Sequence, residues 1–183
     1  MQALAVMFQP HGFRALFGVP AHLVTNEGIE AVGVIGSEVS RLYEQLGNTE
    51  SFFERVRLLD VFLLRRLDRS RPLDPIHRAL DRLISPDSPS NVSEIALNAG
   101  VTTRQLERKA LDYIGVSPKL MVRIARYQRA MQMKVSGSNT WTEIAHALEY
   151  HDQMHMIHDF HQFVGGTPNS ALHEIAPDHL VNF

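Results

Sequence analysis

The sequence contains no cysteine. Neither a disulfide framework nor a thiolate metal site can form, so any metal would have to be bound by His, Asp and Glu side chains. No apolar run approaches the roughly 20 residues that cross a bilayer, and the N-terminus lacks the basic segment and long apolar stretch of a secretory signal. We therefore expect a cytoplasmic protein with no membrane partner.

Lysine and arginine are absent from residues 135–183, which contain six acidic residues and seven histidines. Residues 102–134 have the opposite character, with eight Lys or Arg against two acidic residues, whereas residues 1–73 hold eight of each. The formal net charge of −2 therefore conceals one basic block. On charge alone, this block is equally compatible with a solvated helix face and with a surface for a polyanion.

The rest of the composition is that of a folded chain, with 44% hydrophobic and 21% charged residues among 183. Apolar residues recur at helical spacing in residues 30–46 and 51–67, which predicts a helical hairpin around Gly47. The first 25 residues alternate weakly and carry glycines and prolines, so one or two short strands with loops are expected there. The segment RSRPLDP, residues 69–75, contains two prolines and predicts a domain boundary.

An internal repeat follows this boundary. VSEIALNAGVTTRQLERKALDYIGVSP at 92–118 and WTEIAHALEYHDQMHMIHDFHQFVGGTP at 141–168 each contain a short helix with (S/T)EIA, a tight turn, and a longer second helix. Both end in a glycine-containing stretch before Ser-Pro or Thr-Pro. The repeat predicts two helix-turn-helix units joined by a linker helix. The fold class is therefore mainly α, with a short β/loop segment and a helical hairpin before the two units.

Helix boundaries in this region are marked by capping residues. A linker helix should run from Pro118 to about Val135, and the predicted caps are Ser90 or Asn91, Thr102, Ser117, Thr140 with Glu143, and Asp152. Glycines at 100, 115 and 165 should close the helices before them. Inside each repeat, the Ile-Ala pair should pack on Leu106 and Leu111 in the first and on Met156 and Phe160 in the second.

The two repeats resemble the C-terminal DNA-binding domain of AraC/XylS-type transcriptional regulators over residues 76–175. The resemblance is carried by EIALNAGVTTRQLERK, by IGVSPKLMVRIARYQRA, and most specifically by EIAHALEYHDQMHMIHDFHQFVGGTP. It implies an AraC-type DNA-binding domain over residues 73–183. Residues 1–72 look like a shortened N-terminal sensor or dimerisation segment.

The sequence departs from the family pattern at several positions. Glu149 stands where the family has glycine, which strains the turn if that turn is left-handed. His158 and His161 stand at positions that are basic in the family, and Met154, Met156 and Ala110 replace its Ser, Phe and Phe. These changes weaken the case for strong DNA contact by the second repeat.

The candidate DNA-binding residues follow from the outer faces of the helices. Arg can bind guanine, Glu can accept from cytosine, Gln can bind adenine, and Met or Ile can meet a thymine methyl group. For the first repeat and the linker helix the candidates are Thr103, Arg104, Glu107, Arg108, Lys109, Lys119 and Arg123. For the second repeat they are Gln153, Met154, Ile157, His158 and His161. Solvated surface side chains are the alternative for the two repeats, and salt bridges to the N-terminal half are the alternative for the linker helix.

The histidines raise the question of a metal site, because His151, His155 and His158 stand four and three residues apart on a helix. The sequence shows no cluster of polar residues around them that could orient these histidines as ligands, so we do not predict a metal or another cofactor. An enzyme is not expected either, since no catalytic constellation stands out.

The leading interpretation is a sequence-specific transcriptional regulator that reads two successive major-groove segments of double-stranded DNA. The alternative is an interaction or ligand-responsive module on the same fold with weakened DNA binding. Other expected partners are a second molecule of the chain through the N-terminal helices, RNA polymerase, and a small effector whose identity the sequence does not indicate.

Overall fold

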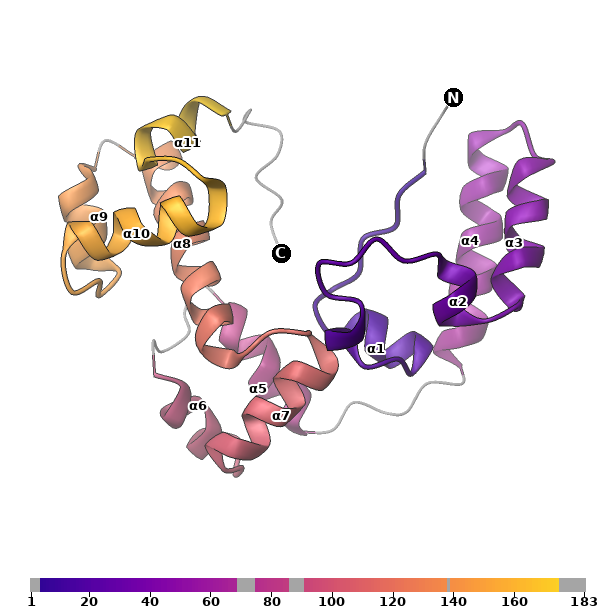
Figure 1. Cartoon of the computed structure of the whole chain (residues 1–183), viewed down its shortest axis with the longest axis horizontal. Helices are drawn as coiled ribbons and strands as arrows, with labels where there is room; N and C mark the ends of the chain where they lie inside the picture. The colour runs from indigo at the N-terminus through magenta and orange to yellow at the C-terminus, as the bar shows by residue number, and fades with distance from the viewer. Residues whose placement is uncertain (1–3, 69–74, 86–90, 138, 175–183) are drawn as a thin grey trace. The chain divides into compact units, whose positions relative to one another are not determined.

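The computed structural model describes residues 4–68, 75–85, 91–137 and 139–174. The chain divides into two compact units (Figure 1). One comprises Met1–His77 with Arg104–Val116, and the other comprises Arg78–Thr103 with Ser117–Phe183. The predicted boundary near residue 72 falls in a segment outside the described residues, and the division into 1–72 and 73–183 stays a prediction.

The described residues form helices and loops without a strand, which confirms the mainly α class. The short strands expected in the first 25 residues are not formed. This segment contains α1, Gly12–Phe17, and a 3-10 turn at Ala21–Leu23 instead. The glycines and prolines that suggested strand ends mark helix ends, because Gly18 closes α1 with a φ of 72°. None of the described helices is long and apolar enough to cross a membrane.

The helical hairpin of the first unit is present. Its arms are α3, Glu38–Gly47, and α4, Phe52–Leu67, preceded by a short α2, Ala31–Ile35. Gly36, with a φ of 96°, separates α2 from α3, so the first arm is broken where the periodicity predicted one helix. Phe17 of α1 stacks on Phe62 of α4 with ring centroids 6.5 Å apart, which joins α1 to the hairpin.

The same unit contains α7, Thr103–Tyr113, for residues 104 onward. His77, at the beginning of α5 (Pro75–Ile84), is buried and meets the Tyr113 ring edge-on with centroids 4.5 Å apart. Its other aromatic neighbour is His11, with centroids 5.6 Å apart. The C-terminal end of α7 therefore packs on residues from the first part of the chain.

The second unit contains α5 from Arg78 onward. Its other helices are α6, Val92–Asn98, the long α8, Pro118–Ser136, α9, Trp141–Ala147, α10, Gln153–Val164, and α11, Pro168–Glu174. Its core holds Met156 and Phe160 of α10 against residues of α8, α9 and α11. Other members of this core are Ala130, Met131, Ile144, Ala145, Leu148, Tyr150 and Ala171. Trp141 is only partly buried, and it contacts the Phe160 ring with centroids 5.5 Å apart.

Four of the predicted N-caps are confirmed, and the cap predicted at Thr102 stays a prediction. Side-chain oxygens of Asn91, Ser117, Thr140 and Asp152 accept hydrogen bonds from backbone N–H groups in the first turns of α6, α8, α9 and α10. Thr140 and Glu143 form the expected reciprocal capping box. Pro118 occupies the first turn of α8, where its missing N–H costs no hydrogen bond.

Candidate nucleic-acid interface

The two repeats have the same turn, bond for bond. In the first, the N–H groups of Ala99, Gly100 and Val101 donate to the carbonyls of Ile95, Leu97 and Ala96. In the second, Leu148, Glu149 and Tyr150 donate to Ile144, His146 and Ala145. All six N···O distances lie between 3.0 and 3.1 Å. The two segments thus close their short helices in the same geometry, which supports the repeat predicted from (S/T)EIA.

The turn requires a left-handed residue in both repeats. Gly100 has a φ of 67° and Glu149 a φ of 56°. A side chain in this region crowds the neighbouring carbonyl oxygen, at a cost of roughly 1–2 kcal/mol per residue. The expected strain at Glu149 is therefore present, and the fold of the second unit overcomes it.

The second helix of the second repeat, α10, begins at Asp152. The Asp152 Oδ1 atom accepts from the backbone N–H of His155 at 2.7 Å, and its Oδ2 atom lies 3.2 Å from His151 Nδ1. The hydrogen bond from the His155 backbone, followed by that from His151, lowers the pKa of Asp152. Because the folded-state pKa is depressed, this cap stabilises α10 at neutral pH and its contribution is lost as acid protonates the carboxylate.

One face of α10 is buried and the other is open. Met156, Asp159 and Phe160 are buried, whereas Met154 is 69% exposed. The predicted contact residues Gln153, His158 and His161 are also exposed, and Ile157 is half-buried. Gln153 lies beside Thr142 of α9, whose hydroxyl donates to Gln153 Oε1 at 2.9 Å. The predicted outer face of α10 is thus open to solvent apart from Ile157.

Arg123 of α8 is held inside the protein. Its Nε and Nη2 atoms donate to Asp159 Oδ1 at 3.0 and 2.6 Å, and Nη2 also donates to Gln162. The Asp159 side chain has no exposed surface, while that of Arg123 is 24% exposed. Arg123 is one of the candidate DNA-binding residues, and its observed partner Asp159 belongs to α10. The ion pair therefore joins α8 to α10, whereas the alternative had expected a salt bridge to the N-terminal half. One signal for this pair was present, because Asp159 precedes Phe160 on the apolar side of α10 and a buried carboxylate needs a partner.

A second arginine of α8 packs in this region. The Arg126 guanidinium lies over the Tyr150 ring, 4.9 Å from its centroid. Burial raises the pKa of Tyr150 well above its usual range, and the nearby Asp159 carboxylate acts in the same direction. Tyr150 is therefore a neutral packing residue of the second repeat.

In the first repeat, the outer face of α7 carries exposed charged residues. Arg104, Glu107 and Arg108 are exposed, and Thr103 is half-buried at the start of the helix. Lys109 is half-buried and lies 5.3 Å above the Tyr113 ring. Lys119, at the start of α8, is exposed. The outer side of α7 thus exposes two arginines and one glutamate.

The buried face of α7 differs from the prediction at one position. Leu106 and Ala110 have no exposed surface, whereas Leu111 is 43% exposed. The expectation that Leu111 packs in the core was wrong, because Leu106 and Ala110 are four residues apart on one face and Leu111 lies off that face. Ala110 occupies the core position where the family pattern has Phe.

An ion pair to α7 was not foreseen. Arg14 of α1 donates from Nε to Asp112 Oδ1 at 3.0 Å, and its guanidinium lies 5.5 Å from the Tyr113 ring centroid. Both side chains are about a quarter exposed. No sequence pattern joins residues that are 98 positions apart.

The histidines that raised the question of a metal site lie in and just before α10. Within the described parts of the chain, no group of three His, Asp or Glu side chains is placed to hold a metal ion. The histidines that face solvent at 151, 155, 158 and 161 are available for hydrogen bonds to an anionic partner.

Comparison with known proteins supports the assignment of this region. Residues 95–173 match the family described as "Helix-turn-helix domain". The match indicates an AraC-type helix-turn-helix domain and supports a DNA-binding regulatory role in general; it is not a match to an enzyme family. Searches among curated proteins and among solved structures gave no match.

Proposed function

We propose that the protein is a sequence-specific transcriptional regulator that reads two successive major-groove segments of double-stranded DNA. The main observation in support is the pair of equivalent turns, each followed by a helix with one buried and one exposed face. Helix-turn-helix proteins present such an open face to base edges. A cytoplasmic location follows from this role.

The contact residues have different tasks in this proposal. Arg104, Glu107 and Arg108 of α7 read base edges, with Thr103, Lys109 and Lys119 at phosphates. Gln153, Met154 and Ile157 of α10 meet bases, and His158 and His161 meet phosphates. Arg123 has 24% of its side chain exposed, so its direct phosphate contact is secondary to its pairing with Asp159.

The test is selection from a randomised pool of double-stranded DNA with the full chain. We expect one enriched motif with two blocks about one helical turn apart, because the two halves should read successive grooves. Competition with unrelated DNA should then show a specificity ratio of at least about 10³. Enrichment of a single block would remove the role of α10, and no enrichment would remove sequence-specific binding altogether.

A second candidate function is favoured by the charge of α10. The helix contains no Lys or Arg, and the arginine beside it is paired with Asp159. An interaction or ligand-responsive module with weakened DNA binding fits this composition. It predicts no enriched motif in the selection, together with weak binding that salt abolishes.

The further partners are part of the same proposal. A second molecule of the chain would bind through the hairpin, where Phe52 is 51% and Phe53 83% exposed. Large exposed apolar side chains at a helix end are typical of interaction surfaces. As a transcriptional regulator, the protein would also contact RNA polymerase and be regulated by a small effector. Sedimentation equilibrium of the parent and of a Phe53→Ser variant tests the dimer.

A further inference from the structure

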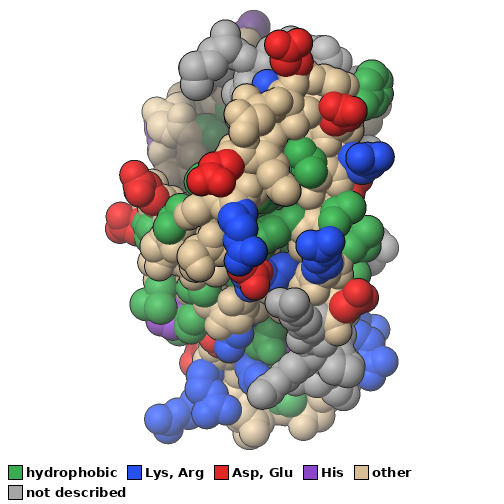
Figure 2. Space-filling model, turned by 90° about the vertical axis from the view of Figure 1, so that its right-hand side faces the viewer, with side chains coloured by type: hydrophobic (Ala, Val, Ile, Leu, Met, Phe, Trp, Pro, Cys, Tyr) green, Lys and Arg blue, Asp and Glu red, His purple; other side chains and the backbone are tan. Residues whose placement is uncertain are grey.

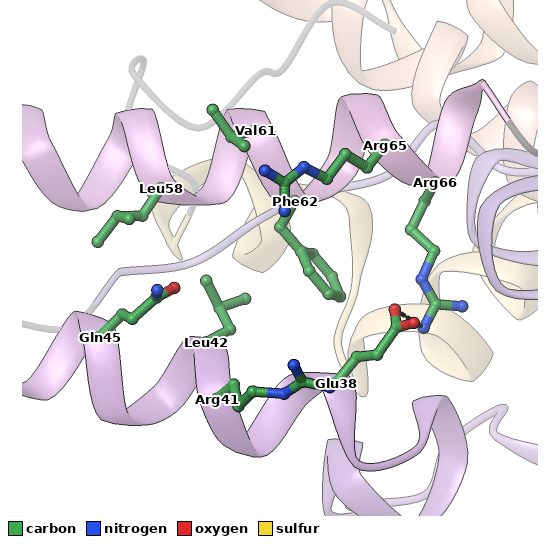
Figure 3. A pocket seen from close by; sticks show the side chains of 9 residues that line it. All are labelled: Glu38, Arg41, Leu42, Gln45, Leu58, Val61, Phe62, Arg65 and Arg66. Carbon is green, nitrogen blue, oxygen red and sulfur yellow. Dashed lines mark hydrogen bonds and ion pairs between the residues drawn. The ribbon is translucent and has the colours of Figure 1, made fainter.

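A groove with a volume of about 420 Å³ lies between the two arms of the hairpin (Figure 3). Its apolar floor is formed by Leu42 of α3 and by Leu58, Val61 and Phe62 of α4. Its polar rim comprises Glu38, Arg41, Gln45, Arg65 and Arg66. Small-molecule sites in proteins commonly have such a volume and combine an apolar surface with a few polar groups.

One end of the groove is already neutralised. Arg66 Nη2 donates to Glu38 Oε2 at 2.8 Å and more weakly to the Ile35 carbonyl at 3.4 Å. The Arg66 guanidinium also lies over the rings of Phe62 and Phe17, 5.6 and 5.7 Å from their centroids. Arg66 and Glu38 are therefore structural members of this site, and their charges cancel.

The two other arginines of the rim are available. Among the described residues, neither Arg41 nor Arg65 has a hydrogen bond, ion pair or ring contact, and both are exposed. In Figure 3 they come from opposite arms, and the Phe62 ring is drawn between their guanidinium groups. Two uncompensated positive charges thus flank an apolar floor, with the Gln45 amide on the same rim.

We propose that this groove binds a small organic anion, namely a carboxylate attached to an apolar body. A guanidinium can donate two parallel hydrogen bonds to a carboxylate, which gives both geometry and charge recognition. Exposed charge pairs alone bind weakly because water and salt screen them, so the apolar body must supply the rest of the affinity. Cations are repelled by Arg41 and Arg65, and a bare inorganic anion leaves the floor uncovered.

Figure 2 shows the side of the molecule on which α3 and α4 lie. Lys and Arg side chains there stand next to exposed hydrophobic ones, with acidic side chains between them. The proposal does not depend on DNA binding, because it concerns the hairpin and is tested without DNA.

The experiment is calorimetric titration of the full chain with octanoate and with phenylacetate. The neutral counterparts octanol and phenylethanol serve as ligand controls. The variants are Arg41→Gln and Arg65→Gln, which remove a positive charge from the rim. Arg57→Gln is the matched protein control, since Arg57 is an exposed arginine of α4 that does not line the groove.

We expect saturable binding of at least one carboxylate with one site per chain. Each rim variant should weaken its Kd about 5- to 10-fold, as loss of one charge-assisted contact predicts. The Arg57→Gln variant should bind like the parent, and the alcohols should bind more weakly than the acids. Circular dichroism and thermal melting of every variant verify that the fold is retained.

Three results would overturn the proposal. The first is no saturable binding of either acid up to about 5 mM, a concentration that detects even millimolar affinity. The second is an equal loss in Arg57→Gln, or equal affinity for acid and alcohol, which would indicate unspecific adsorption. The third is a dimer, seen by sedimentation equilibrium, that Arg41→Gln dissociates, since a second molecule would then cover the groove.

Discussion

The helices α7 and α10 occupy equivalent positions in the two repeats, and each is held by an Arg–Asp ion pair of a different kind. Asp159 of α10 is completely buried and paired with Arg123 of the preceding α8. Asp112 of α7 is 28% exposed and paired with Arg14, which comes from the start of the chain. The two pairs are unequal in burial and in the part of the chain that supplies the arginine.

This difference separates a self-contained helix from a dependent one. The core around α10 is built from residues 130–172, so the second repeat with α8 carries its own support. The far end of α7 rests on Arg14, His77 and Tyr113 contacts within the first unit. Substitutions in the N-terminal part should therefore destabilise α7, the basic helix. They should leave the stability of α10, the histidine-rich helix, unchanged.

The largest expected effect is on the buried pair. Asp159→Ala or Arg123→Ala should each lower the free energy of unfolding of the second unit by about 3–5 kcal/mol, because each leaves a charge or cavity without compensation. The double variant Arg123→Met with Asp159→Leu should recover most of this loss. Urea unfolding followed by circular dichroism measures all three. A double variant as unstable as the sum of the single ones would show that the ion pair is not the cause.

The next effect concerns the basic helix. Arg104→Ala or Arg108→Ala should each cost about 1–3 kcal/mol of DNA binding and relax the preference at one base position. The reason is the loss of a bidentate guanine contact. Lys119→Ala should instead weaken all sequences alike and reduce the salt slope by about one. Fluorescence anisotropy at several salt concentrations distinguishes the two classes, and no loss for any variant would remove DNA from this surface.

The dependence of DNA affinity on pH tests whether α10 contacts DNA as α7 is proposed to do. Contact with a phosphate favours the cationic form of an imidazole, so DNA binding through His158 and His161 should take up protons. Affinity should rise as the pH falls from about 8 to about 6 and decline again on return. Replacing both residues by Arg should give tight binding at either pH. A flat profile, with the double Arg variant no tighter than the parent, would leave α10 without DNA contact.

A smaller effect is expected at the two turns. Glu149→Gly should stabilise the second unit by about 0.5–1 kcal/mol, because glycine adopts the left-handed conformation freely but loses more backbone entropy on folding. The mirror change Gly100→Ala should destabilise by about 1 kcal/mol. A Cβ atom at Gly100 would meet no other atom within 4 Å, so its cost is confined to the backbone. Equal and opposite shifts in urea midpoint would confirm that the turns are equivalent.

The smallest effect is expected at the exposed pair. Arg14→Gln should lower the free energy of unfolding by no more than about 1 kcal/mol, since partly exposed ion pairs are weak. Hydrogen exchange should nevertheless quicken at the C-terminal end of α7 and remain unchanged in α10. Faster exchange in both helices would contradict the distinction between a dependent and a self-contained helix.

The local signals in the sequence were sufficient for much of this structure. Thr140 with Glu143, Asp152, and Ser117 before Pro118 are short-range capping patterns, and each forms the predicted cap. The strands expected in the first 25 residues were wrong because weak alternation there competes with aromatic packing of Phe8, Phe13 and Phe17 in and around α1. Such packing depends on the fold and leaves no periodic pattern.

The sequence predicted which residues of the candidate interface are exposed better than it predicted which residues they contact. Helical spacing placed Arg104, Glu107, Arg108 and His158 on open surfaces, which the structure confirms. It could not show that Arg123 is committed to Asp159, since the partner lies 36 residues away on another helix. Long-range ion pairs depend on how helices pack, and the helix periodicity contains no information about that.

The buried pair of Arg123 and Asp159 also constrains how this chain can change over generations. A single replacement at either position leaves a charge in the protein interior, so it should be tolerated poorly, whereas a joint replacement by apolar residues should be tolerated well. The two codons are therefore expected to vary together among descendants of this sequence. An apolar residue at position 159 should therefore accompany the loss of arginine at 123.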